Sequence, residues 1–307
     1  MIHARLRIVG VLIAVLLTAQ SAAAWGREGH RVIARIAARN LNQTARKKVA
    51  VILATNDAGL EAAMAAASTW PDEIDKKKTG TDTWHFIDVP ITVPFSITGL
   101  CPNHNCVLDR IAEMQNRLAT NAKGFTLATP PSPPRPMTSQ EMAFLIHFVG
   151  DVHQPLHAAT DGDRGGNCVN LIHPLVHSDG TKTTELHAVW DVDEVIAMAN
   201  ALGSESSIVA TLFQRFKNGA TVAQLMPTDW AHESNDLAKK DIYQKLNLPN
   251  HTAPAGQCAT GIAKTDVSTA YVTGNVADVE TQMLRAGIRL SNVINQMCAG
   301  TGCNAKP

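Results

Sequence analysis

The chain has 307 residues, with 27 Lys and Arg against 27 Asp and Glu, and 45% of its residues are apolar. This charge balance excludes the strongly basic surface that proteins use to hold nucleic acid through many phosphate contacts. The length and the apolar content suffice for a sizeable core, in one large domain or two ordinary ones.

Residues 1–24 have the pattern of a secretory signal. Two arginines precede an apolar run over residues 8–17, and three alanines end the segment at Ala24. An uncleaved membrane anchor is the alternative, but the run is shorter than the ~20 apolar residues that a spanning helix needs. We therefore expect cleavage after Ala24, a mature domain over residues 25–307, and a secreted or periplasmic protein that is not held in a membrane.

All six cysteines lie after residue 24. An even number of cysteines in an oxidising compartment favours disulfides over thiolate zinc sites, although six cysteines permit 15 pairings. Short separation makes Cys101–Cys106 and Cys298–Cys303 the economical guesses, which leaves Cys168–Cys258 as a long-range pair.

Helical periodicity dominates the mature chain. The pattern predicts helices over 29–40, 43–54, 106–121, 139–152, 185–201, 206–217, 228–246 and 267–298. Strand signals are weak, and one hairpin over 169–172 and 181–184 accounts for them. The proline-rich run 130–136 cannot be helical, and we interpret it as a surface loop rather than a domain boundary. The expected fold is mainly α, a single domain with long loops and at most a small β-hairpin.

The segment HFVGDVHQPLH, residues 147–157, places polar side chains among apolar ones. His147 and Asp151 are four residues apart, so they share one helix face, and the rest of helix 139–152 is apolar nearly all round. A buried charge is costly unless it is paired or bound to a metal. A lone core histidine is the simpler alternative, but the same spacing recurs at His187 and Asp191, and two such pairs favour metal ligands.

Three shorter fragments add further candidates. They are WGREGH with His30, STWPDEI with Asp72, and WHFID with His85. Imidazole and carboxylate groups together suit zinc. Each fragment alone is weak, since His30 fits a surface position, Asp72 fits a helix cap, and the neighbouring Trp70 and Trp84 fit core anchors.

Taken in order, these fragments resemble the secreted tri-zinc single-strand nucleases of the S1 and P1 type. The landmarks are Trp25 with His30, W-x-D at 70–72, W-H-F-I-D at 84–88, H-x3-D-x-H-Q-P-L-H at 147–157, D-R-G-G-N at 163–167 and L-H-x-x-W-D at 186–191. The resemblance extends from Trp25 to about Cys298. It implies the helical fold that these nucleases share with zinc-dependent phospholipase C.

The resemblance also implies three zinc ions. Asp72, His85, His147 and Asp151 would hold the first ion; His157, His187 and Asp191 the second; and His30, Asp151 and the α-amino and carbonyl groups of Trp25 the third. Three Zn²⁺ ions bring six positive charges and the ligand carboxylates return three negative ones, so the site attracts phosphate without a basic patch. Asp72 would orient the attacking water and accept its proton.

The implied activity is endonucleolytic hydrolysis of single-stranded DNA and RNA to 5′-phosphate products, together with removal of phosphate from 3′-nucleotides. Phe86 and Asp88 would hold one unstacked base, with core packing as the alternative for Phe86. Asn167 would contact phosphate or base, or else cap the hairpin turn. Many relatives carry a basic residue shortly after W-x-D, whereas this chain has Asp75 followed by Lys76, so a phosphate-binding role at that place is left open.

Two other functions fit parts of the pattern. A zinc-dependent phospholipase C shares the N-terminal tryptophan and the zinc ligands, but no aromatic-rich loop suggests a lipid-facing surface. A non-catalytic periplasmic zinc-binding protein would want exposed, repetitive histidine tracts, whereas these candidates are dispersed. We therefore predict a monomeric zinc-dependent nuclease.

Overall fold

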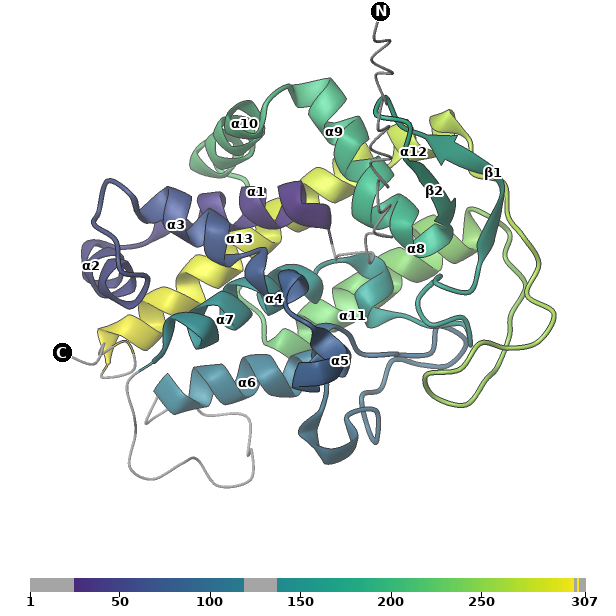
Figure 1. Cartoon of the computed structure of the whole chain (residues 1–307), viewed down its shortest axis with the longest axis horizontal. Helices are drawn as coiled ribbons and strands as arrows, with labels where there is room; N and C mark the ends of the chain where they lie inside the picture. The colour runs from purple at the N-terminus through teal and green to yellow at the C-terminus, as the bar shows by residue number, and fades with distance from the viewer. Residues whose placement is uncertain (1–24, 119–136, 301–302, 304–307) are drawn as a thin grey trace, which may run out of the picture.

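The computed structural model describes residues 25–118, 137–300 and 303. The expected signal segment 1–24 and the proline-rich run 130–136 lie outside the described residues. Helices make up most of the described chain, with a single small antiparallel sheet among these residues (Figure 1). The expected mainly helical fold is confirmed.

Two elements of the first half carry Asp72 and His85, namely α4 (Trp70–Glu73) and the 3₁₀ turn η1 (Asp82–His85). This half also contains α1 (Gly26–Asn40), α2 (Gln43–Ile52), α3 (Leu60–Ala67), α5 (Lys76–Thr79) and α6 (Val107–Leu118), with the 3₁₀ turn η2 (Pro102–His104). The second half contains α7 (Ser139–Asp151), η3 (Pro155–Ala158), α8 (Leu186–Ala188), the π-helix η4 (Val189–Asp193), α9 (Glu194–Leu202), α10 (Glu205–Lys217), α11 (Pro227–Leu237), the π-helix η5 (Ala238–Gln244), α12 (Thr269–Gly274) and α13 (Val276–Ala299).

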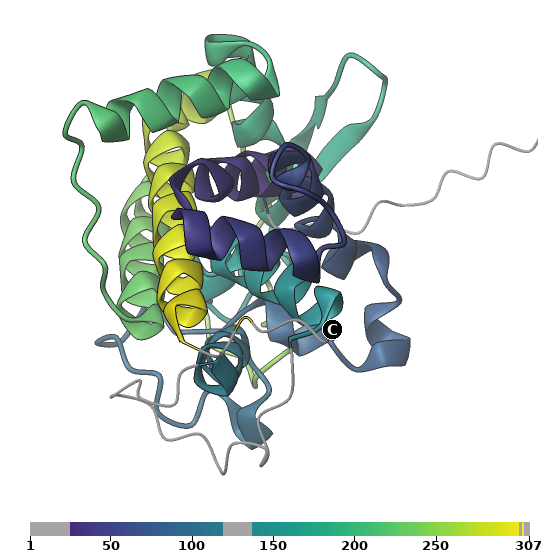
Figure 2. The ribbon, with the colours of Figure 1, turned by 90° about the vertical axis from the view of Figure 1, so that its left-hand side faces the viewer.

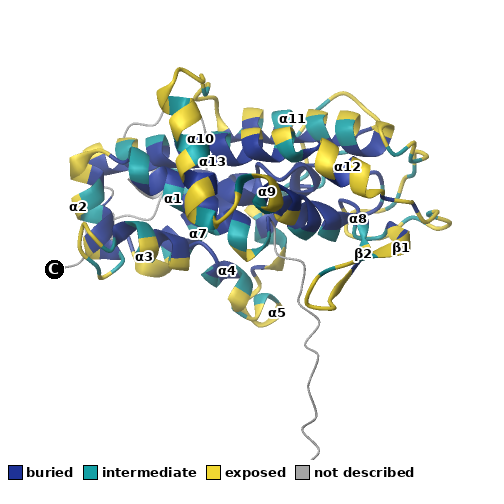
Figure 3. Cartoon of the chain, turned by 90° about the horizontal axis from the view of Figure 1, so that it is seen from above, coloured by how far each residue is buried: buried dark blue, intermediate teal, exposed yellow. Residues whose placement is uncertain are grey.

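The long helix α13 runs through the body of the molecule, and α1, α7 and α11 lie around it (Figures 1 and 2). Helices α1 and α13 pack closely at Gly287, where a Cβ atom would lie 2.6 Å from the side chain of Ile36. Glycine is therefore required at this crossing, because any side chain would push the two helices apart. The inward faces of these helices are buried and their outer faces are exposed (Figure 3).

Local signals explain where several helices begin. Thr138 and Glu141 form a capping box at the start of α7, since each accepts a hydrogen bond from the other's backbone N–H. The Asn42 side chain caps α2 by accepting from Ala45 N, and Ser204 caps α10 in the same way. These caps satisfy backbone N–H groups that have no partner within the helix.

Some predicted helices differ from the observed ones. The expected helix 267–298 is broken at Asn275, whose side chain turns inward and donates to the buried carboxylate of Glu194. The expected helix 185–201 begins one residue later, after strand β2, and passes through the π-helix η4. The expected helix 228–246 likewise ends as the π-helix η5. A π-turn adds a residue per turn, which apolar periodicity does not reveal.

Helix α3 was not predicted. Its sequence, LEAAMAAA, has few large apolar residues, so its periodicity is faint although alanine is the strongest helix former. Leu60 and Met64 are fully buried, and α3 packs on α1 and α7. This packing places Ser68, just after α3, beside the functional site.

Strands β1 (Asn170–Val176) and β2 (Lys182–Glu185) form the expected antiparallel hairpin, with Asn170 opposite Glu185 and a bulge before Leu175. The first strand is longer than predicted. All six cysteines form disulfides in the expected pairs, Cys101–Cys106, Cys168–Cys258 and Cys298–Cys303. The long-range pair ties the loop before β1 to the segment that follows η5.

No single helix in the described part of the chain is both long and apolar enough to cross a membrane. The bent pair 186–202 and 205–217 meets the length and composition criteria only when its two arms are taken together.

Candidate metal centre

Helix α7 supplies the central pair of the site. His147 and Asp151 are fully buried, and four-residue spacing brings His147 Nε2 to 3.3 Å from Asp151 Oδ2. The predicted placement of both side chains on one helix face is therefore what the structure has. Helix α7 can hold them in place because its other faces pack against α3, α6 and α13.

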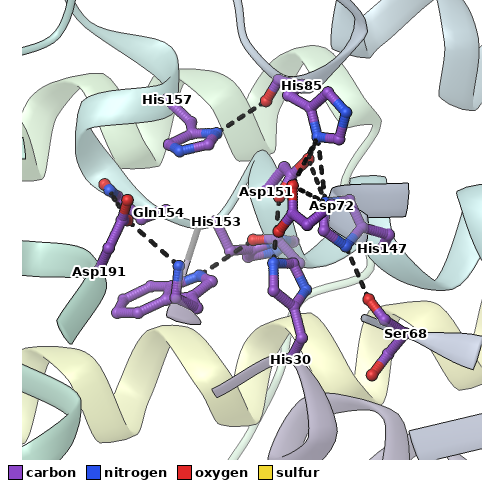
Figure 4. Close-up of polar contacts among 12 residues, drawn as sticks. His30, Ser68, Asp72, His85, His147, Asp151, His153, Gln154, His157 and Asp191 are labelled. Carbon is purple, nitrogen blue, oxygen red and sulfur yellow. Dashed lines mark hydrogen bonds and ion pairs between the residues drawn. The ribbon is translucent and has the colours of Figure 1, made fainter. Parts of the chain in front are cut away.

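Four donor atoms converge beside α7 (Figure 4). His85 Nδ1 lies 3.0 Å from both His147 Nε2 and Asp151 Oδ2, while Asp72 Oδ1 lies 3.5 Å from His147 Nε2 and 3.8 Å from His85 Nδ1. With zinc-to-ligand distances of about 2.0–2.1 Å, tetrahedral geometry separates neighbouring donors by about 3.3 Å. These separations bracket this value, so Asp72, His85 and His147 can hold one zinc ion together, and Asp151 Oδ2 lies close to both histidine nitrogens.

A second group comes from η3, α8 and η4. His157 Nε2 and His187 Nε2 are 3.2 Å apart, and His187 Nε2 is 3.2 Å from Asp191 Oδ2. The π-turn η4 follows directly on the short helix α8, and this winding carries Asp191 back toward His187. These three donors suit a zinc ion that keeps a further coordination position for water or substrate.

His30 faces the remaining oxygen of Asp151. His30 Nε2 lies 3.3 Å from Asp151 Oδ1, and the His30 ring stacks on His147 at 4.0 Å. The two oxygens of Asp151 therefore point to two different groups of ligands, as a bridging carboxylate would. The backbone nitrogen of Trp25 lies beside Asp191 instead, donating to Asp191 Oδ1 at 3.2 Å, while the Trp25 indole donates to Gly150 O.

Three of the five candidate ligand histidines form hydrogen bonds with backbone carbonyl oxygens. His147 Nδ1 bonds to Ser68 O, His157 Nδ1 to His85 O, and His187 Nδ1 to Gly165 O, at 2.6–2.8 Å. A carbonyl can only accept, so in each ring Nδ1 is protonated when the imidazole is neutral, and the lone pair is on Nε2. In each ring Nε2 is the atom that faces the metal group, which is the arrangement typical of a histidine ligand.

Several buried polar atoms at the centre have no hydrogen-bond partner. They are both ring nitrogens of His30, His85 Nε2, Asp151 Oδ1 and Asp191 Oδ2. An unsatisfied buried polar atom is costly, and a cluster of them is rare in folded proteins. Bound metal ions would give partners to His30 Nε2 and to both carboxylate oxygens at once. The side chains at this centre therefore fit bound metal ions.

The electrostatics of the centre favour a cation. Although burial alone would lower the pKa of His147, the carboxylates of Asp151 and Asp72 raise it to about 9. Asp191 likewise raises the pKa of His187 to about 9 against the effect of burial. By contrast, burial lowers the pKa of His157 to about 4. The carboxylates thus produce a strongly negative field that a divalent ion would neutralise.

Two residues at the centre were not predicted as site residues. Gln154 is fully buried, donates from Nε2 to Asp191 Oδ1 at 2.6 Å and accepts from Leu156 N. Lys76 Nζ donates to Asp72 Oδ1 at 2.7 Å, and together with His147 it holds the pKa of Asp72 well below its usual range despite burial. The sequence could have pointed to Lys76, because it lies four residues after Asp72. It could have pointed to Gln154, because this residue lies between the candidate ligands Asp151 and His157.

The predicted base-binding residues are Phe86, Asp88 and Asn167. Phe86 is half-buried and directly follows His85, whereas burial and nearby Asp163 raise the pKa of Asp88 to about 6. Asn167 Nδ2 donates to Arg164 O at 2.8 Å, which matches the turn-capping alternative for that side chain. Trp70 and Trp84 are half-buried, and both pack edge-on against Phe144.

Comparisons with known proteins give a consistent result. The family model described as S1/P1 Nuclease matches residues 25–299. Endonuclease 3 of Arabidopsis thaliana is 29% identical over 95% of this chain and 95% of its own length. Nuclease P1 of Penicillium citrinum is 26% identical over 89% and 97%, and Nuclease S1 of Aspergillus oryzae is 26% identical over 93% and 96%.

Proposed function

The chain belongs to the S1/P1 nuclease family, and on this premise we propose that its mature form uses three zinc ions to cleave single-stranded DNA and RNA. Members of the family are zinc-dependent phosphodiesterases that act on nucleic acids, so the chain is a nuclease. Membership of this family favours a nuclease over the two alternatives, a phospholipase C and a non-catalytic zinc-binding protein. Formation of 5′-phosphate products and hydrolysis of 3′-nucleotides are parts of the proposal.

The observation that carries the proposal is the convergence of three adjoining sets of buried donors. Asp72, His85, His147 and Asp151 would hold one ion; His157, His187 and Asp191 another; and His30, Asp151 and the terminal groups of Trp25 the third. When bound, zinc supplies Lewis-acid stabilisation of phosphoryl charge and lowers the pKa of water toward neutrality.

Among the three ligand carboxylates, Asp72 is the one suited to orient the attacking water. Its side chain is 9% exposed, whereas Asp151 and Asp191 are completely buried, so solvent reaches Asp72 first. The low pKa of Asp72 keeps it ionised and able to accept a hydrogen bond from the attacking water. Lys76 donates to the same carboxylate from outside the metal set and fixes its orientation.

The burial of the metal-binding atoms would make the enzyme prefer single strands to duplexes. The metal-binding donors are buried, so a phosphate in a duplex cannot reach them unless its strand separates from the partner. A single unstacked nucleotide can place its base against Phe86, and stacking of this kind contributes about 1–3 kcal/mol per base without regard to sequence. Asp88 would accept or donate a hydrogen bond at the base edge.

We also propose that the domain begins at Trp25 after removal of residues 1–24, and that the protein is a monomer outside the cytoplasm. Three disulfides support an oxidising compartment. Cleavage would convert the Trp25 amide into a free amine, which is a metal ligand that a peptide nitrogen cannot be. Before cleavage this nitrogen donates to Asp191 Oδ1 at 3.2 Å, a donor of the second set.

The test combines three measurements on one purified sample: metal content, N-terminal sequence, and products from single-stranded and duplex DNA and RNA. We expect three zinc ions per chain, Trp25 as the first residue, and 5′-phosphate ends released faster from single strands. Release of phosphate from a 3′-nucleotide checks the nucleotidase activity. Fewer than three ions, or another first residue in active protein, would overturn the three-zinc proposal.

A further inference from the structure

A short disulfide loop adjoins the segment that carries His85. Cys101 and Cys106 close this loop, which leads directly into α6. Inside it, Asn103 and His104 both have left-handed backbone conformations, with φ of 57° and 56°. Such conformations cost free energy for residues other than glycine, and they persist where the surrounding structure enforces them. The disulfide and these two residues together restrict the conformations open to the loop.

The residues on both sides of Cys106 form hydrogen bonds with the residues on both sides of His85. Asn105 Oδ1 accepts a hydrogen bond from the Trp84 indole at 2.5 Å, and Val107 N donates to Phe86 O at 3.2 Å. Cys106 thus lies between the two contacts on one segment, as His85 does on the other.

Further contacts fix the loop against α6 and against Trp84. His104 Nδ1 lies 3.2 Å from Asp109 Oδ2 in the first turn of α6, and Arg110 donates to His104 O. The Arg110 guanidinium also lies over the Trp84 ring, 5.0 Å from its centre. Trp84 is consequently held between this loop and the aromatic rings of α7.

We propose that the loop closed by Cys101 and Cys106 is a positioning element, which orients His85 toward the metal set and Phe86 toward the base. The inference rests on the proposed function for the role of these two residues. The outer ring nitrogen of His85, Nε2, has no hydrogen-bond partner, so the orientation of the ring depends on the neighbouring loop. By contrast, His147, His157 and His187 each bond through Nδ1 to a backbone carbonyl oxygen.

The experiment compares two disulfides of equal sequence separation. The double variant Cys101→Ser, Cys106→Ser opens the loop, and Cys298→Ser, Cys303→Ser opens a matched loop at the end of α13. We expect the first variant to lose zinc to a chelator at about 10–100-fold lower chelator concentration, with a raised KM for single-stranded DNA. The second variant should match the wild type in both measurements. Equal behaviour of the two variants would overturn the inference.

Asn105 gives a test that leaves the disulfide intact. Asn105→Ala removes the acceptor for Trp84 and should reproduce part of the loss, whereas Asn105→Asp keeps the acceptor and should restore zinc retention and KM. If Asn105→Asp behaves like Asn105→Ala, the proposed contact does not position His85. Zinc retention is measured without substrate, so it tests the inference even if the wild type fails to cut single strands, a result that would count against the proposed function alone.

Discussion

The carboxylate of Glu194 gives this protein a specific dependence of stability on pH. Glu194 is fully buried; Oε1 accepts from Asn275 Nδ2 at 2.9 Å, while Oε2 has no hydrogen-bond partner. Burial raises its pKa from 4.5 to about 8, although Asn275 and nearby Lys245 act in the opposite direction. The folded protein therefore keeps a proton here that the unfolded chain releases.

The sign and size of the effect follow from linkage. Between pH 4.5 and 8 the folded state binds more protons at Glu194 than the unfolded state, so the free energy of unfolding falls as pH rises. The contribution is complete below pH 4.5 and is lost by the time pH passes about 8. At 1.36 kcal/mol per pKa unit, the loss amounts to about 5 kcal/mol.

The assay is urea unfolding of the wild type and of Glu194→Gln from pH 4.5 to 9, with zinc saturating in both. Glutamine stays neutral, so the variant lacks this titration, and the difference between the two proteins cancels every other titrating group. We expect similar stability at pH 4.5 and a variant more stable by several kcal/mol at pH 9. Parallel curves over this range would refute a protonated Glu194 in the folded protein.

Three further predictions concern the metal centre and the disulfides. Asp72→Asn should leave zinc content largely intact and lower hydrolysis by orders of magnitude; metal analysis with a nuclease assay checks this, and full activity would remove Asp72 from its proposed role. Gln154→Leu removes the donor to Asp191 and should weaken zinc binding by about 10–100-fold, measured by competition with a chelator; an unchanged affinity would contradict the orienting role. Replacing Cys168–Cys258 with alanines frees a loop with a sequence separation of 90 residues and should lower stability by about 4–5 kcal/mol, against about 2 kcal/mol for either short disulfide, as urea midpoints will show.

Local spacing made much of the centre predictable. His147 and Asp151, like His187 and Asp191, are four residues apart, and one helical turn brings such residues together whatever the rest of the fold does. The caps of α2 and α7 and the hairpin are also short-range features. The helical class and the family resemblance could therefore be inferred before any tertiary structure was known.

Tertiary packing decided the features that depend on distant segments. The faint helix α3 forms against α1 and α7, and this brings Ser68 O to His147. The contacts of Trp25 with Asp191 and of Asn105 with Trp84 depend on where whole elements lie and how their side chains turn. The sequence determined which donor atoms each turn of helix could present, because that depends on backbone geometry alone. Only the packed structure decided which oxygen of Asp151 faces which ligand set, because that orientation depends on contacts among segments far apart in the chain.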